Sequence, residues 1–544
     1  METIRHTRGK MKKRNLTRGC AVLLTLTMLA LAGCGGGKSA ATAESQGGQN
    51  SPAATEAAGG GEAAKSRDFV YCCGTEPTTL DPHLINDNAT ARAAYQIYET
   101  LVYRDTDSSI KPRLAESWTT SDDGTVWTFK LRQGVKFHDG ETFNAEAVKY
   151  NIERLKNPET AAPKASVVDM VKSVDVVDEY TVAFTLSEPS SVFLAQISSY
   201  TTGMLSPKSA ESQGKEFGQH PVGTGPLKLD SWDYGSSLVM TRFDDYWGEK
   251  ATVDSITFRI VPEDASRVMM LKTGDADLVA GIPPVQIEEL QSDPNVKVLV
   301  ETGYRTIFLG MNSTVKPLDD VRVRQAVNYA IDRESIIKNV MRDVASYPDS
   351  FMVSNVIDNS AKGLGCYEFD QEKAKALLAE AGYADGFTLT LSTPEGRYAM
   401  DRQVAEVIQA MLMEVGITAE INVLDWGAYS EQATSGQHQF FLLGMGCPTG
   451  DPEFNLFMNF GTEGPQNYSR FSNAAVDQLL AEQSTILDAE ERSKVMYQIQ
   501  EELKNDACGA PLYYEQQTYG SGADVNGFII YPDENASMAY LVRE

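Results

Sequence analysis

One stretch, residues 122–155, most strongly constrains what this chain can fold into. An Asp-Asp-Gly turn ends at Gly124, and the next eight residues alternate between two faces, which is typical of a half-buried strand. Asn144 then stands where a helix N-cap is expected, and Val148 and Ile152 begin an apolar stripe at helical spacing. This order of turn, strand and helix predicts a protein of mixed α/β class.

The front of the chain has the pattern of an export signal. Residues 1–33 hold seven Lys and Arg and one Glu, and residues 21–32 form an uninterrupted run of weakly to strongly apolar residues. Such a run is too short to span a membrane comfortably and is typical of a signal peptide. It ends in Leu-Ala-Gly before Cys34, which resembles a bacterial lipobox, where the Cys is lipidated and becomes the mature N-terminus. The alternative is ordinary secretory cleavage, and the true start, Met1 or Met11, stays open.

Residues 34–66 are rich in Gly, Ala, Ser and Gln and show no apolar period. Such a segment cannot bury enough surface to offset its ordering entropy. We expect a disordered tether with an r.m.s. reach of roughly 30 Å. A lipid at one end and a folded body at the other would need a connection of this kind.

Composition excludes some classes of function. The formal net charge of −27 argues against nucleic-acid binding, because nothing would neutralise the phosphates. The chain lacks the G-x-S-x-G, H-E-x-x-H, Walker and Rossmann motifs, which argues against an enzyme. We expect no cofactor and no metal site, since the histidines after the leader are scattered. They are His83, His138, His220 and His438.

Seven cysteines are present, of which Cys20 lies in the leader and Cys34 in the lipobox. The five others are odd in number and match no metal-site spacing, so the sequence leaves open whether any two of them pair. They are Cys72, Cys73, Cys366, Cys447 and Cys508.

The body of the chain alternates strand and helix patterns. Residues 387–391 alternate as a strand, 404–415 carry a long apolar stripe, and 418–423 return as a strand, which predicts a βαβ unit and a parallel sheet. A hairpin is expected at residues 174–186. Asp319 is expected to cap a helix, and a further helix is expected from residue 89 to Leu101.

The sequence between Ala115 and Leu155 closely resembles that of one family, the bacterial extracellular solute-binding proteins, family 5. These are extracytoplasmic solute-binding proteins of ABC importers that carry peptides, nickel complexes and related solutes. The resemblance extends from about Phe69 to the C-terminus. It implies a type II periplasmic-binding-protein-like clamp, in which two lobes joined by a hinge carry an extra inserted α/β domain.

The resemblance also implies the domain organisation. The first domain is expected to be discontinuous, at about 67–104, 222–304 and 511–544. The second, about 105–221, is an insert, and the third covers about 305–510. The solute is expected to bind between the first and third domains, with closure as a population shift. The closed form would then dock on the permease and ATPase subunits of an importer, and we expect a monomer held at the cell membrane by its lipid.

Family resemblance also directs attention to the third domain for the ligand-binding residues. Arg397 matches an arginine that pairs with the carboxylate of the ligand in peptide-binding relatives, although one gap is needed and a surface arginine is the alternative. Trp426 is expected either as a wall of the solute pocket or as a packing residue. The expected ligand-binding residues are Arg397, Trp426, Tyr429, Met445, Asp451 and Phe454.

The loop from Gly446 to Phe454 departs from the family pattern. The place of the aspartate that holds the α-amino group of the ligand falls on Pro448, and Asp451 aligns better with a second, more structural Asp-Pro. This departure weakens a plain dipeptide interpretation and leaves a modified peptide, a glutathione-like solute or a metal chelate. A nickel or metallophore binder of the same fold and a secreted hydrolase are the rival functions.

We predict that Cys34 carries a diacylglycerol and that the mature protein fractionates with membranes. Cys34→Ala should release the protein or leave an uncleaved precursor, because the acceptor thiol is gone. Fractionation of the native cells, with mass spectrometry of the N-terminal peptide, checks this. Wild-type protein that is fully soluble and unlipidated would contradict the prediction.

Overall fold

The computed structural model describes residues 66–352 and 363–544 of the chain. The expected leader, the expected lipidation site Cys34 and residues 34–65 of the expected tether lie outside this part, so those expectations stay predictions. Within the described residues, no helix combines the length and the apolar character that a membrane crossing requires.

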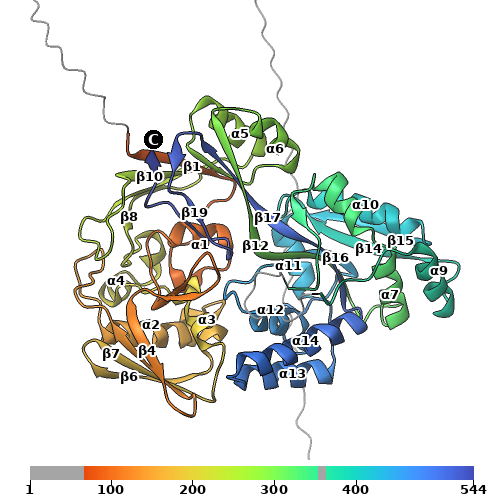
Figure 1. The fold of residues 1–544 in the computed structure, drawn as a ribbon, viewed down its shortest axis with the longest axis horizontal. Helices are drawn as coiled ribbons and strands as arrows, with labels where there is room; N and C mark the ends of the chain where they lie inside the picture. Colours follow the sequence, from red (N-terminus) through yellow and green to blue (C-terminus); the bar gives the residue numbers. More distant parts are fainter. Residues whose placement is uncertain (1–65, 353–362) are drawn as a thin grey trace, which may run out of the picture. The chain divides into compact units, whose positions relative to one another are not determined.

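One mixed sheet runs through the body of the protein (Figure 1) and contains eleven described strands. Strands β14 and β15 pair in parallel, which confirms the predicted βαβ unit. The order across the sheet is β15 (Ile417–Leu424), β14 (Phe387–Pro394), β16 (Phe440–Met445), β12 (Val296–Met311), β17 (Gly509–Gly522), β11 (Leu278–Ala280), β1 (Asp68–Cys73), β10 (Ser255–Ile260), β9 (Ser237–Arg242) and β8 (Leu227–Asp233), with β13 (Ala345–Ser346) beside β17.

The two longest strands, β12 and β17, join the two halves of this sheet. Residues 296–302 of β12 pair with 516–522 of β17, and residues 306–310 pair with 509–514, with a register shift between the two runs. β12 continues into the half that contains β14, β15 and β16, and β17 continues into the half that contains β1 and β8–β11. We call the β1 half the first lobe and the β14 half the second lobe.

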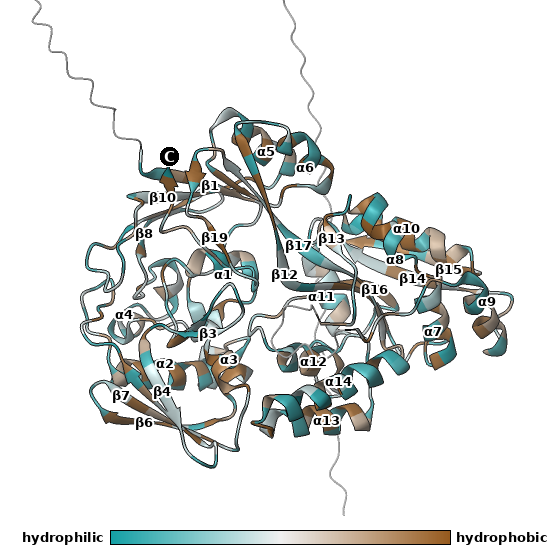
Figure 2. Ribbon diagram, in the orientation of Figure 1, coloured by the Kyte–Doolittle hydropathy of each residue, from teal (hydrophilic) through white to brown (hydrophobic). Residues whose placement is uncertain are grey.

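Each lobe has its own core and helices. In the second lobe, α14 buries Val495, Met496, Ile499 and Leu503 and mixes hydrophilic with hydrophobic residues along its length (Figure 2), as expected for a helix packed on one face. The first-lobe helices are α1 (Asn88–Ala94), α5 (Asp264–Thr273) and α6 (Pro284–Gln291). The second-lobe helices are α7 (Val321–Ala330), α8 (Arg333–Ser335), α9 (Gln371–Glu380), α10 (Asp401–Met413), α11 (Trp426–Thr434), α12 (Pro452–Phe460), α13 (Ala474–Thr485) and α14 (Ala489–Asn505).

The segment that opened the sequence analysis forms the core of an inserted domain. Asn144 caps α2, as predicted, by accepting from the N–H of Ala147 at 3.1 Å. Phe129 and Ile152 are buried in the same hydrophobic core, which is separate from the cores of the two lobes. The strands are β4 (Ala115–Thr120), β5 (Val126–Leu131), β7 (Thr181–Leu186) and β6 (Val171–Asp178) in sheet order, with the small pair β2 (Val102–Arg104) and β3 (Ile110–Pro112). The helices are α2 (Ala145–Lys156), α3 (Phe193–Ile197) and α4 (Pro207–Gln213).

Two expectations need correction. The N-cap of α7 is Asp320, one residue after the predicted Asp319, and its side chain accepts from the N–H of Arg322 at 2.9 Å. Helix α1 ends at Ala94 rather than near Leu101, and beyond it the carbonyls of Gln96 and Ile97 accept from the N–H groups of Leu227 and Gly225.

The start of β17, up to Tyr514, packs in the second-lobe cores, so the strand crosses to the first lobe near Glu515. The five described cysteines are free thiols.

Glu99 joins the inserted domain to the first lobe. Its carboxylate is fully buried and accepts from Arg113 Nε at 3.2 Å, from the hydroxyls of Thr224 and Tyr246 at 3.0 and 2.8 Å, and from the Trp247 indole at 2.8 Å. One charge therefore satisfies donors from both sides of the junction.

We predict that Glu99→Gln lowers the free energy of unfolding by about 3–5 kcal/mol, because it leaves Arg113 without its buried partner. Urea unfolding followed by circular dichroism checks this. The matched control is Glu116→Gln, since Glu116 is exposed and 3.9 Å from Arg132, and it should change the stability by about 1 kcal/mol or less. Equal unfolding midpoints for the two variants would contradict a special role of Glu99.

Candidate functional site

A cavity of about 670 Å³ lies between the two lobes. Arg92 and the loop from Gly281 to Pro284 line it from the first lobe, and residues 395–403 line it from the second. Arg305 and Glu515 line it from the crossing strands β12 and β17. The second-lobe wall follows the carboxyl end of β14, which is where open parallel sheets place their ligands.

Asp401, the first residue of α10, holds the loop that carries Arg397. Its carboxylate accepts from the backbone N–H groups of Arg397 at 3.0 Å, Tyr398 at 3.2 Å and Arg402 at 2.8 Å. Burial raises the pKa of Asp401, and these donors oppose the rise. The backbone of Arg397 is therefore fixed at the edge of the cavity.

The Arg397 side chain is the uncommitted charge of this wall. Its Cζ lies 4.8 Å from the ring centre of Trp426 and 5.7 Å from that of Tyr398. Its Nε is buried and donates to no acceptor among residues 66–352 and 363–544, and no carboxylate of that part forms an ion pair with it. A guanidinium held in this way can bind a planar anion.

Trp426 and Tyr429 form a stack behind Arg397. Their rings are 5.5 Å apart at 15°, and Trp426 remains 40% exposed. Tyr429 is fully buried, and its hydroxyl donates to the carbonyl of Leu442, so it supports the stack from the core. Trp426 therefore supports Arg397 and is not part of the cavity lining.

Met445, Asp451 and Phe454 lie away from the cavity lining. Met445 ends β16 and is buried in a second-lobe core. Phe454, in α12, packs into the core of the inserted domain. Of the six expected ligand-binding residues, the structure brings Arg397 to the cavity, with Trp426 against its guanidinium.

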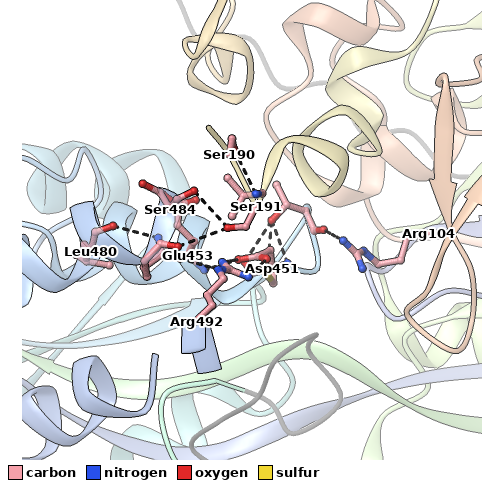
Figure 3. Close-up of polar contacts among 12 residues, drawn as sticks. Arg104, Ser190, Ser191, Asp451, Glu453, Leu480, Ser484 and Arg492 are labelled. Carbon is pink, nitrogen blue, oxygen red and sulfur yellow. Dashed lines mark hydrogen bonds and ion pairs between the residues drawn. The ribbon is translucent and has the colours of Figure 1, made fainter. Parts of the chain in front are cut away.

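Asp451 is engaged by Arg492 (Figure 3). Two ion-pair hydrogen bonds of 2.7 and 2.8 Å join the two side chains, and both are buried. Asp451 also caps α12 by accepting from the N–H of Glu453 at 2.9 Å. These contacts agree with the alignment of Asp451 on a structural Asp-Pro.

The inserted domain contacts the second lobe beside this ion pair (Figure 3). The N–H of Ser191 donates to the carbonyl of Ser484 at 3.1 Å, and Arg104 donates to the carbonyl of Thr449. Glu453 lies at the same junction. Burial, aided by the charge of Asp451, raises its pKa to about 7, and Arg492 opposes the rise.

Sequence reasoning missed one feature of the cavity. Arg305 binds two acidic residues, Glu515 in β17 and Glu534 near the C-terminus. Glu534 lies 229 positions from Arg305, so no local pattern in the sequence could have shown the contact. No group of three or more His, Cys, Asp or Glu in the described residues is arranged to hold a metal ion.

Comparison with known proteins adds to this geometry. The family profile of the bacterial extracellular solute-binding proteins, family 5, matches residues 109–467. The glutathione-binding protein GsiB of Salmonella typhi is 33% identical over 487 residues, which cover 88% of this chain and 94% of GsiB.

Solved structures resemble the fold as well. The periplasmic binding protein DppA from Helicobacter pylori, in complex with the peptide STSA, is 30% identical with a TM-score of 0.78, over 88% of this chain and 98% of DppA. NikZ from Campylobacter jejuni, in complex with Ni(L-His), is 25% identical with a TM-score of 0.77, over 85% and 95% of the two chains.

We predict that Glu453 makes stability depend on pH. The folded protein keeps this proton up to about pH 7, while the unfolded chain loses it near 4.5, so stability falls as the pH rises through this window. Glu453→Gln should raise the urea midpoint above that of the wild type at about pH 8 and change little at about pH 4. The control is the exposed Glu463→Gln. A difference between wild type and Glu453→Gln that is constant with pH would contradict the assignment.

Proposed function

This chain belongs to the bacterial extracellular solute-binding proteins, family 5, and from this premise we propose that it captures a peptide or peptide-like solute between its lobes and delivers it to an importer from a lipid anchor. It is a substrate-binding protein of an ABC importer and works outside the cytoplasm. Its relatives bind solutes and are not enzymes.

The observation that carries the proposal is the uncommitted guanidinium of Arg397 at the edge of the cavity. A carboxylate is the natural partner for it, because a planar fork of donors fits two carboxylate oxygens. DppA holds a peptide and GsiB is named for glutathione, and both ligands carry carboxylates. A cavity of about 670 Å³ falls in the range of about 300–1,000 Å³ that is usual for small-molecule sites.

Closure of the two lobes on the solute is expected because residues of both lobes line the cavity. Arg92 lies in the first lobe and Arg397 in the second, so a solute that touches both walls gains all of its contacts when the lobes are together. Such a solute shifts the population toward the closed state. The paired strands β12 and β17 are the connection about which the lobes would move.

The anchor completes the proposal. A lipid on Cys34 and the residues that follow it would hold the body near the membrane while leaving it free to reach the permease. We propose that the closed protein docks there as a monomer.

A metal chelate is the second candidate solute. NikZ, whose structure holds Ni(L-His), resembles this chain at 25% identity. A chelate formed with an amino acid also presents carboxylate oxygens to Arg397, and the metal would then be part of the cargo. The resemblance to DppA and GsiB is greater, and for this reason we place a peptide-like solute first.

Native mass spectrometry of the gently purified protein tests the proposed class of solute. We expect a bound species with the mass of a small peptide or of a modified peptide. A mass shift with a nickel isotope pattern would favour the chelate. Turnover of the bound solute would contradict the binding function.

We predict that Arg397→Ala weakens binding of the copurified solute by at least about thirtyfold, which corresponds to the loss of about 2 kcal/mol or more from a buried charge pair. Arg397→Lys should rescue only part of the affinity, because a point charge cannot make the bidentate contact. Isothermal titration checks both variants. The control is Arg322→Ala, which removes a surface arginine of the same lobe, and an Arg397→Ala affinity equal to this control would contradict the role of Arg397.

A further inference from the structure

The acidic groups of the cavity are already paired. Arg305 lies at the crossing of β12, and its Nε is 3.0 Å from Glu515 while its Nη2 is 2.5 and 2.7 Å from the two carboxylate oxygens of Glu534. All three side chains are largely buried. The guanidinium of Arg305 thus bonds both carboxylates that line the same cavity, and the charge of Arg92, which lines it too and acts on Glu534, balances the second negative charge.

The position of Glu534 is enforced from the backbone. It lies in the turn between β19 (Ile529–Ile530) and β20 (Ala536–Ser537), with φ of 71°, a left-handed conformation that is costly for a residue with a side chain. Arg92 donates to its carbonyl oxygen at 3.1 and 3.0 Å. With the backbone placed in this way, the carboxylate reaches Arg305 and forms both hydrogen bonds with it.

Other acids in or near the cavity have partners as well, whereas Glu263, which lines it without an ion pair, is exposed. Asp401 accepts three backbone N–H groups. Asp264, at the mouth, pairs with the buried Arg267. Asp451, outside the cavity lining, is bound by Arg492.

The paired acids and the uncommitted Arg397 give the cavity a charge preference. A buried ammonium would meet no buried carboxylate without a partner in the described lining, because Glu263, which has no ion pair there, is exposed. Burial of an unpaired charge carries a large penalty. A solute anion would meet Arg397. Arg305 is the residue that prevents Glu515 and Glu534 from serving an ammonium.

We propose that this protein selects anionic peptide-like solutes whose amine is blocked, for example by acylation, and that Arg305 determines this selectivity. The inference rests on the proposed function, since it names the class of solute that the cavity takes. The solute carboxylate pairs with Arg397, and its amide nitrogen carries no charge that would need a carboxylate.

The test compares two probes that differ in one group, alanyl-glutamate and N-acetyl-alanyl-glutamate, by isothermal titration on the solute-free wild-type protein. The inference expects the acetylated probe to bind at least about tenfold more tightly, since the free ammonium has no partner. Equal or tighter binding of the free amine overturns the inference and leaves the proposed function in place. If neither probe binds, the peptide-like function fails, and the inference fails with it.

Substitutions of Arg305 and of its partner Glu534 then test the role of Arg305 itself. Arg305→Gln frees two carboxylates and should shift the ratio of the two affinities by at least about tenfold toward the free amine. Arg322→Gln is the control and should leave the ratio unchanged. Thermal melts establish whether each variant folds.

Glu534→Gln provides a second readout that does not depend on Arg305→Gln being folded. It leaves Arg305 with one carboxylate, so the cavity becomes more positive and the ratio should move further toward the acetylated probe. A ratio that stays at the wild-type value in the folded variants overturns the role of Arg305.

Discussion

The pairing of β12 with β17 is the constraint on which the other features depend. Both lobes belong to one sheet because these strands pass from one half to the other, and the register shift between Thr302 and Thr306 lets the ladder change direction there. The shift also places Tyr304 so that its N–H donates to the carbonyl of Pro532 at 2.9 Å. The cavity floor is therefore made of the hinge itself, and Arg305 and Glu515 are part of both.

Features with local signals were predictable from the sequence. The cap at Asn144, the hairpin in the inserted domain and the βαβ unit of β14 and β15 all follow from patterns within a few residues, and the structure confirms them. The sequence motif between Ala115 and Leu155 indicated the family for a similar reason. These are the parts of the fold in which neighbours in sequence remain neighbours in space.

The candidate site was predictable only in part, because its contacts join distant segments. The position of Arg397 could be predicted from the strand before it. Its lack of an ion partner could not, because that depends on the acids of other segments being paired with other residues. The sequence alone could not distinguish the role of Tyr429 from that of Trp426, since both lie in the first turn of the same helix. Three residues along a helix place them on one side, and there Trp426 meets Arg397 while Tyr429 enters the core.

The stack behind Arg397 also gives the protein an optical property. The chain has five tryptophans, and Trp426 is the one whose ring lies 4.8 Å from the Arg397 guanidinium. Indole emission responds to the electric field of a nearby charge. An anion that binds the guanidinium would cancel part of that field. The four others, Trp118, Trp127, Trp232 and Trp247, lie in the inserted domain or the first lobe. The wavelength of intrinsic fluorescence should thus report arrival of a charged solute without any added label.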